Sequence, residues 1–319
     1  MNILQECSGA KRIGISGHIR PDGDCVGSCL ALCSFLRKQM PEAAVTVFLE
    51  NPPETFKNLV GFEEISSDFN VQEPMDVFFA LDCSEDRLGG AQPIYEKAAK
   101  KINIDHHISN KGCGDISLVV PEASATAEVL YDLLVQGGID TEIAEALYVG
   151  IIHDCGVFQY SNTSPRTLEI GAKLIQFGFN FPKIIEETFY QKTYLQTQIM
   201  GRALMESIRF MDGSCIVSCV DKKEMEFYNV TSKDMDGIVN QLRNIKGVHC
   251  AIFMYQTDVL EYKVSMRSDE LVNVAEVASY FGGGGHMRAA GCTMKGTFHD
   301  CVNNLSFHIE KQMKENKDV

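Results

Sequence analysis

The sequence lacks an apolar run long enough to cross a membrane. Its first residues, MNILQECSGAKR, also lack the apolar core of a signal peptide. We therefore expect a cytoplasmic protein with no membrane partner. With 319 residues, of which 45% are hydrophobic, the chain can build two domains that each bury a core.

Paired CxxC spacing is absent as well, although the chain has twelve cysteines. Cys25, Cys29 and Cys33 recur every four residues, which places them on one face of a helix. We expect reduced core cysteines rather than disulfides or a thiolate metal site. Cys83 and Cys155 adjoin candidate functional residues, so their sensitivity to oxidation depends on their exposure.

Positive charge is scarce, since 29 Lys and Arg face 43 Asp and Glu for a net charge of −14. This balance argues against a broad basic surface that grips long duplex nucleic acid. It does not exclude small phosphate-bearing substrates, because bound divalent cations can reverse the sign of an acidic site.

Short apolar runs alternate with helical patterns in the first half of the chain. Strands are predicted at residues 12–16, 44–49, 76–82, 102–104 and 116–120, and helices at 26–40, 124–136, 141–153 and 164–178. This alternation is typical of βαβ units, so we expect an α/β domain with a mostly parallel sheet flanked by helices.

The second half predicts a smaller α/β domain. Strands are expected at residues 214–220, 248–255 and 261–268, and helices at 194–210, 232–244 and 273–280. The expected organisation is a catalytic domain at residues 1–190, a connector helix at 191–211 and a substrate-binding domain at 212–319.

Acids and histidines follow the predicted strands at several points. The stretch KINIDHHISN, residues 101–110, ends a strand in an acid and two histidines. His18, Asp22 and Asp24 follow the first strand, Asp82 ends another, and Asp154 follows a helix. Because ligand sites in α/β sheets lie at the carboxyl ends of the strands, we expect these side chains to converge.

Each of these residues also has a purely structural interpretation, since an acid after a strand often caps a helix. Together, however, carboxylate oxygens and imidazole nitrogens suit Mn²⁺, Mg²⁺, Fe²⁺ or Zn²⁺. Two such cations would need a shared carboxylate, and they could activate a water for attack on phosphorus.

The glycine run at residues 282–285 lacks the order of a Walker or Rossmann loop. Its unobstructed NH groups could hold an anion, with His286 and Arg288 as neighbouring donors. From the residues alone, a flexible surface loop is as well supported.

The motifs HIRPDGD, LDCSED, IDHH and GIIHDCG resemble the four ordered motifs of the DHH phosphoesterase superfamily. GGGGHMRAAG resembles the signature of the associated C-terminal domain. The length and layout are most similar to the NrnA-type branch of bifunctional oligoribonucleases and 3′-phosphoadenosine 5′-phosphate (pAp) phosphatases.

The resemblance implies a role for each matched residue. One metal would be held by His18, Asp22 and Asp82. The other would be held by Asp24, Asp82, His106 and Asp154, which makes Asp82 the bridge. The resemblance gives His107 a catalytic role facing the scissile phosphate.

Asp105 would orient a histidine without binding metal. His153 departs from the small residue expected before the motif acid, and we expect it to support the site or the structure. The implied substrate-binding residues are Arg267, Ser268, Gly283, Gly284, Gly285, His286 and Arg288.

The expected activity is therefore hydrolysis of short RNA to mononucleotides and of pAp to AMP. It would use two divalent ions, with Mn²⁺ favoured over Mg²⁺ or Co²⁺, in a monomer or homodimer. A cyclic-di-AMP or linear-dinucleotide phosphodiesterase would use the same parts, and a nucleotide-binding sensor without catalysis is the alternative from another class. A DHH inorganic pyrophosphatase and a long-strand exonuclease fit less well.

Overall fold

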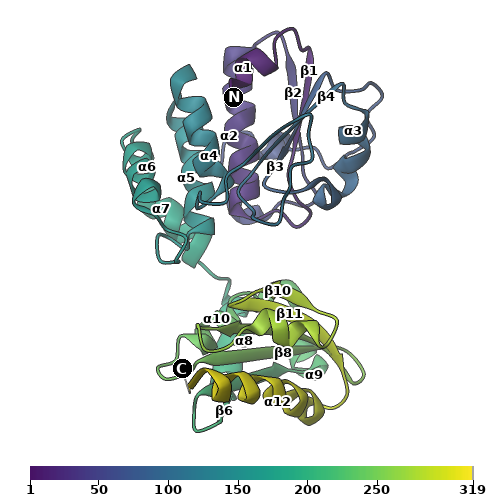
Figure 1. Ribbon diagram of the computed structural model, residues 1–319, viewed down its shortest axis with the longest axis vertical. Coiled ribbons are helices and arrows are strands. Elements are labelled where there is room, and N and C mark those ends of the chain that lie inside the picture. Colours follow the sequence, from purple (N-terminus) through teal and green to yellow (C-terminus); the bar gives the residue numbers. More distant parts are fainter. Residues whose placement is uncertain (318–319) are drawn as a thin grey trace. The chain divides into compact units, whose positions relative to one another are not determined.

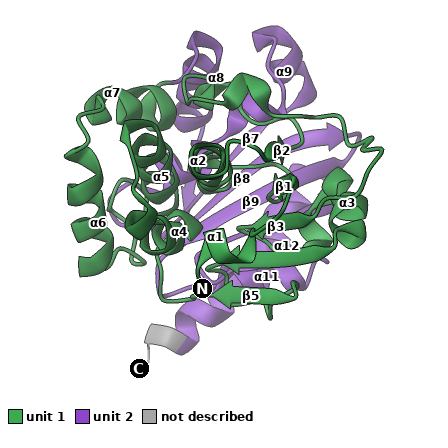
Figure 2. Cartoon of the chain, turned by 90° about the horizontal axis from the view of Figure 1, so that it is seen from above, with its two compact units in different colours: residues 1–191 green, residues 192–319 purple. Residues whose placement is uncertain are grey.

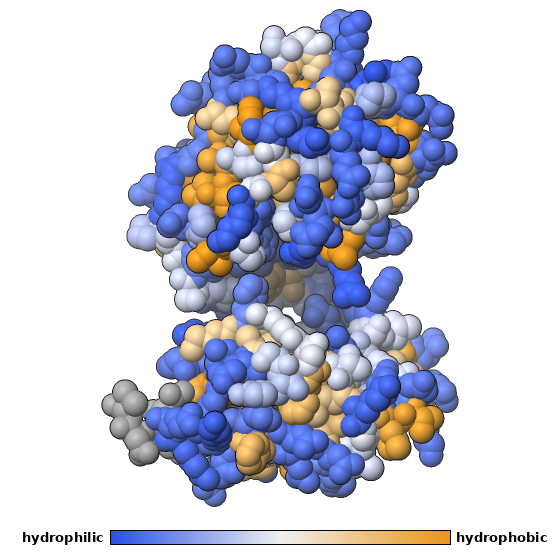
Figure 3. Space-filling view, turned by 45° about the vertical axis from the view of Figure 1, so that its right-hand side comes forward, coloured by the Kyte–Doolittle hydropathy of each residue, from blue (hydrophilic) through white to orange (hydrophobic). Residues whose placement is uncertain are grey.

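The computed structural model describes residues 1–317 and consists of two compact units, Met1–Gln191 and Lys192–Val319 (Figures 1 and 2). Within the described residues, no helix is long and apolar enough to cross a membrane. The face of each unit drawn in Figure 3 is mostly hydrophilic, with apolar side chains in small separate spots.

In residues 1–317, the first unit contains a parallel sheet of five strands in the order β2-β1-β3-β4-β5. The strands are β1 (Arg12–Ser16), β2 (Ala44–Phe48), β3 (Val77–Leu81), β4 (Lys100–Asp105) and β5 (Ile116–Val119). Each pairs in parallel with its neighbour, as in Ile13 with Val77. The prediction of a mostly parallel sheet flanked by helices is confirmed.

Helices cover both faces of this sheet (Figure 2). They are α1 (Ile3–Glu6), α2 (Gly23–Gln39), α3 (Gln92–Lys97), α4 (Thr126–Leu134), α5 (Thr141–Asp154), α6 (Pro165–Ile175) and α7 (Phe181–Ile185), followed by the π-helical turn η6 (Glu186–Tyr190). Strand β3 is buried on both sides, so its apolar run is continuous. Val77 and Phe79 face the core formed with α2, α4 and α5, whereas Phe78 packs in a smaller core with Tyr95 of α3.

The second unit contains a mixed sheet, which among the described residues has six strands in the order β10-β11-β9-β8-β7-β6. The strands are β6 (Ile208–Phe210), β7 (Cys215–Val220), β8 (Cys250–Asp258), β9 (Glu261–Ser268), β10 (Gly284–His286) and β11 (Ala289–Lys295). Of these six strands, only β7 and β8 pair in parallel. The smaller C-terminal α/β domain is thereby confirmed as a fold.

Helices α11 (Val274–Ser279) and α12 (Phe298–Lys317) form one core with a face of this sheet, and α8 (Tyr194–Met205) and α10 (Ile238–Arg243) form another with the opposite face. A short helix α9 (Lys222–Tyr228) follows β7. The helix predicted at residues 194–210 ends earlier, because residues 208–210 pair with β7. The helix predicted at 232–244 is interrupted by Gly237, whose φ of 83° is left-handed.

Candidate metal centre

The loop after β1 brings two candidate ligands to the carboxyl edge of the first sheet. His18 is 5% exposed, and its Nδ1 lies 2.9 Å from the carbonyl oxygen of Ile19. Asp22 caps α2 by accepting hydrogen bonds from the backbone NH groups of Asp24 and Cys25, at 3.1 Å each. The His18 Nε2 atom then lies 3.6 Å from Asp22 Oδ2.

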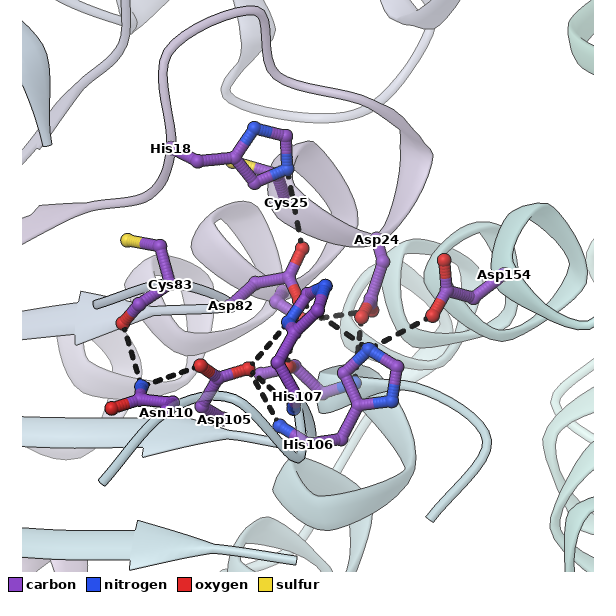
Figure 4. Close-up of polar contacts among 12 residues, drawn as sticks. His18, Asp24, Cys25, Asp82, Cys83, Asp105, His106, His107, Asn110 and Asp154 are labelled. Atoms are coloured by element: carbon purple, nitrogen blue, oxygen red, sulfur yellow. Dashed lines mark hydrogen bonds and ion pairs between the residues drawn. The ribbon is translucent and has the colours of Figure 1, made fainter. Parts of the chain in front are cut away.

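Asp82 follows β3 directly and lies at the centre of the cluster (Figure 4). Its φ of 59° is rare for a residue with a side chain, and the strand end holds it there through a hydrogen bond from its NH to Ile104 O. Oδ2 lies 3.4 Å from His18 Nε2, and Oδ1 lies 3.6 Å from His106 Nε2. The two oxygens of this buried carboxylate therefore face different histidines.

The end of β4 supplies the acid and two histidines of the central motif. Asp105 is fully buried, and its Oδ1 accepts hydrogen bonds from the backbone NH groups of His106 and His107 at 2.7 and 3.0 Å. The same oxygen accepts a hydrogen bond from His107 Nδ1 at 2.8 Å. Asp105 thus contacts the His107 ring and the backbone of both histidines. Burial acts to raise the pKa of Asp105, but hydrogen bonds from His107 and Asn110 lower it.

Asp24 and Asp154 complete the cluster from two helices. Asp24 is 1% exposed and accepts hydrogen bonds from the NH groups of Thr126 and Ala127 at the start of α4. Asp154 is the last residue of α5, where the helix dipole disfavours a carboxylate without a nearby cation. Its Oδ2 lies 2.9 Å from His106 Nε2.

The structure therefore brings together all six residues predicted as metal ligands. Within residues 1–317, three groups have ligand atoms within 4.8 Å of one another, namely His18–Asp22–Asp82, Asp24–His106–Asp154 and Asp82–Asp105–His106–His107. The first group has the residues of one predicted ligand set, and the second has three of the four residues of the other set. The fourth, Asp82, has its Oδ1 atom 3.6 Å from His106 Nε2. Their role as ligands stays a prediction.

The histidine tautomers indicate what the cluster can hold. In His18 and His106, Nδ1 faces a carbonyl oxygen, which only accepts hydrogen bonds, so Nδ1 carries the proton. Each Nε2 lone pair then points at carboxylate oxygens, an arrangement that needs a proton or a cation between them. The buried Nε2 of His106 forms no hydrogen bond in the described structure, although Asp154 is close.

The raised pKa values of these groups also indicate that the cluster binds positive charge favourably. Burial disfavours charged His18, yet the nearby carboxylates of Asp22 and Asp82 raise its pKa to about 11. His106 is likewise opposed by burial, but its pKa rises to about 10 beside Asp154 and Asp24. Burial and mutual repulsion raise the pKa of Asp24 and Asp82. A divalent cation would relieve both effects, so the donor set fits such ions.

Several supporting residues were missed by the sequence analysis. Thr126 donates from Oγ1 to Asp82 at 3.0 Å, and Ala123 O lies 3.2 Å from His106 Nδ1. Asn110 donates to Asp105 Oδ2 at 2.5 Å and to Cys83 O at 3.1 Å. Asn110 closes the motif DHHISN and could have been noted, whereas nothing local marks Thr126 or Ala123.

His153 lies beside the cluster and, within residues 1–317, forms no hydrogen bond or ion pair with a predicted ligand. Its Nε2 bonds to Thr188 Oγ1 at 3.0 Å, and its ring packs against Phe56 and Phe189 with centroid distances of 5.0 and 5.5 Å. A Cβ added to Gly23 would lie 2.2 Å from its ring, so the glycine between two candidate ligands makes room for it. This position agrees with a supporting role.

Cys83 and Cys155 are 1% and 0% exposed. Burial raises the pKa of the Cys83 thiol well above its usual value and that of Cys155 to about 11. Both thiols are therefore protonated and shielded, which makes them poor targets for oxidation.

The second half of the glycine run lies in β10, which forms a hairpin with β11. Gly284 pairs with Gly291, and His286 pairs with Ala289, which pairs in turn with Arg267. A Cβ on Gly283 would lie 2.2 Å from Gly291 O, so the close approach requires glycine.

The other predicted substrate-binding residues divide between the two faces of this sheet. Arg267 and His286 share a face, as their register requires. Arg288 is exposed, and its Nη2 atom lies 3.5 Å from Glu270 Oε2. Ser268 points the other way, is 8% exposed and donates to Val272 O at 2.6 Å, so its side chain is not presented with the others.

In comparisons with known proteins, each of the two units matches its own family model. Residues 12–151 match the DHH family, N-terminal domain, and residues 212–315 match the DHHA1 domain. The chain is 31% identical to a bifunctional oligoribonuclease and PAP phosphatase NrnA of Thermus thermophilus, covering 89% of this chain and 84% of the relative. It is 27% identical to the protein of that name in Bacillus subtilis, over 87% of each. An exopolyphosphatase-related protein of Bacteroides fragilis has a similar structure, with a TM-score of 0.89, 27% identity and coverage of 99% and 96%.

Proposed function

Because the chain belongs to the DHH family of phosphoesterases and is a hydrolase of phosphoester bonds, we propose that it hydrolyses short RNA oligonucleotides to mononucleotides and converts pAp to AMP. The names of the relatives from Thermus thermophilus and Bacillus subtilis support both activities. The observation that carries the proposal is the convergence of histidine lone pairs and buried carboxylates at the carboxyl edge of the first sheet.

Enzymes of this family depend on metal, and two cations would be held by the two groups that share Asp82. His18 and Asp22 lie on the side of Asp82 Oδ2, and His106 lies on the side of Oδ1. Asp24 and Asp154 complete the second group. When bound, the ions would supply Lewis-acid activation of water and neutralise charge on the phosphate.

The protein would contribute orientation and a proton donor. His107 donates from Nδ1 to Asp105, which fixes the ring and leaves Nε2 available to a substrate oxygen. The hydrogen bond with Asp105 raises the pKa of His107. A protonated Nε2 suits stabilisation of the phosphate or protonation of the leaving oxygen.

The chemistry of the donor atoms supports Mn²⁺ as the proposed ion. All six predicted ligands offer carboxylate oxygen or imidazole nitrogen, and the twelve cysteines contribute none of the grouped ligand atoms within residues 1–317. This mixture suits Mn²⁺, with Mg²⁺ or Co²⁺ as alternatives.

In the second unit, Arg267, the glycine hairpin, His286 and Arg288 would bind the nucleotide. Arg267 and His286 present cationic or hydrogen-bonding groups on one sheet face, beside backbone that only glycine leaves accessible. This combination suits a phosphate or the edge of a base.

Purified protein with Mn²⁺ should be assayed against a dinucleotide RNA, pAp, a cyclic dinucleotide and pyrophosphate, with Asp154→Asn as the control for metal-site chemistry. Turnover of the RNA and pAp that is lost in the variant is expected. Turnover of the cyclic dinucleotide alone would replace the proposal with a cyclic-dinucleotide phosphodiesterase. Nucleotide binding without turnover of any substrate would instead indicate a sensor.

A further inference from the structure

In residues 1–317, the part of the second sheet formed by β9, β11 and β10 is covered by α11 and α12 on one side, whereas on the other side α10 contacts β9. Tyr262, Val264 and Met266 of β9 point into the core that contains α11 and α12, as do Cys292 and Met294 of β11. The alternate residues of these strands are half-buried or exposed, because α8 and α10 form their core mainly with β7 and β8. Figure 1 shows α12 running along its side of the sheet.

The strand register orders the side chains of this open face in rows. One row contains His286, Ala289 and Arg267, and the next contains Gly284, Gly291 and Ser265. A third row pairs Thr293 with Lys263. The middle row has almost no side-chain bulk, so a ligand lying along β9 could approach the backbone closely between Arg267 and Lys263.

Charge on this face favours a polyanion. Lys263 is exposed, and no residue within 1–317 forms an ion pair with it. Glu261, the acid on the same face of β9, forms an ion pair with Lys295, with 3.8 Å between Oε2 and Nζ. In a chain with a net charge of −14, Arg267 and Lys263 on one open face form a local positive strip.

Arg267 and Lys263 are four positions apart, which corresponds to about 13 Å along an antiparallel strand. A single nucleotide held near Arg267 and His286 does not extend that far, whereas a single-stranded oligonucleotide does. We propose that Lys263 binds a phosphate of the nucleotides that follow the one held near Arg267 in the RNA. Lys263 thereby selects oligonucleotides by length, an inference that rests on the proposed function.

The test compares Lys263→Ala with Lys311→Ala, an equal charge change on exposed α12, the helix on the opposite side of the sheet. Binding of end-labelled pentanucleotide RNA by metal-free protein is measured by fluorescence anisotropy at several salt concentrations. Kinetics with Mn²⁺ then compare the pentanucleotide with pAp.

For Lys263→Ala, we expect the Kd and KM of the pentanucleotide to rise about threefold to fivefold. The slope of log affinity against log salt should fall by about 0.7, the value for one phosphate contact of a single strand. The kcat for the pentanucleotide and both constants for pAp should stay unchanged, as should every constant of Lys311→Ala.

Thr293→Glu provides a second variant, because it adds a negative charge beside Lys263 and leaves the lysine in place. It should weaken binding of the pentanucleotide and leave pAp unaffected. Equal losses for pAp and the pentanucleotide, or an unchanged salt slope, would overturn the role of Lys263. Failure of the unaltered protein to turn over either substrate would count against the proposed function, while the binding measurement would still decide the role of Lys263.

Discussion

The hydrogen bond between His153 and Thr188 offers a direct test of how the first unit supports its acidic cluster. The Thr188 hydroxyl donates to Ile184 O at 2.8 Å, so its oxygen must accept the bond from His153 Nε2 at 3.0 Å. Thr188→Val removes this acceptor with little change in shape, whereas Thr188→Ser retains it. The valine variant should therefore leave a mostly buried NH group without a partner.

The cost of an unsatisfied buried donor is about 1–3 kcal/mol. In a unit the size of Met1–Gln191, a loss of about 2 kcal/mol corresponds to a Tm lower by roughly 4–8 °C. Thr188→Ser should remain close to the unaltered protein. In a His153→Phe background, which has no NH to satisfy, Thr188→Val should cost much less.

The same histidine predicts a pH dependence. Burial lowers the pKa of His153 to about 4, despite the opposing effect of Asp22 and Asp154. Between about pH 6.5 and pH 4 the unfolded state binds a proton that the folded state does not, so this contribution to stability falls as the pH falls. Its size is about 3 kcal/mol, and it is fully present above pH 6.5. His153→Phe should remove this part of the pH dependence.

Calorimetry of the metal-free full-length chain, with denaturant unfolding at pH 4.5, 5.5 and 7, would measure these effects. The single and double variants should be compared under identical conditions. Additive effects of Thr188→Val and His153→Phe, or an unchanged pH dependence in His153→Phe, would refute the role assigned to this hydrogen bond.

Three further predictions concern metal and substrate. Asp82→Ala should abolish turnover and lower the metal content measured by elemental analysis, because both cations lose a ligand; near-normal activity would contradict the bridge. Arg267→Ala should mainly raise KM at unchanged metal content, and loss of metal would contradict its role in substrate binding. Mn²⁺ binding should weaken as pH falls, because the metal must displace protons from His18 and His106, whose carboxylate neighbours raise their pKa to about 11 and about 10. Calorimetric titration in two buffers of different ionisation enthalpy should show proton release, and binding without release would argue against these two ligands.

Much of the first unit was predictable because its strands are continuous apolar runs that end in acids or histidines. The predicted strand at residues 12–16 has the bounds of β1, and the helix predicted at 141–153 differs from α5 by one residue. The predicted strand at residues 261–268 likewise has the bounds of β9. Its polar and apolar residues alternate because one face of the strand is buried and the other is open.

The second unit was harder to predict, because non-local pairing decides several of its elements. The glycine run has little intrinsic preference for a strand, yet it pairs with β11 where only glycine allows the backbones to approach. Helix α12 was not predicted, although Cys301, Leu305 and Ile309 recur at helical spacing and are buried. The sequence also grouped Ser268 with Arg267, whereas successive strand residues point to opposite faces.

The sequence by itself determined that acids and histidines would meet, since residues that follow neighbouring parallel strands must share one edge of the sheet. It carried the order of the motifs and the chemistry of their donor atoms. Only the tertiary structure decided which oxygen of Asp82 faces each histidine, that Thr126 and Asn110 hold the acids in place, and that Lys263 shares an open face with Arg267. These details depend on backbone carbonyls, caps and strand register contributed by distant segments, and no local pattern of residues encodes them.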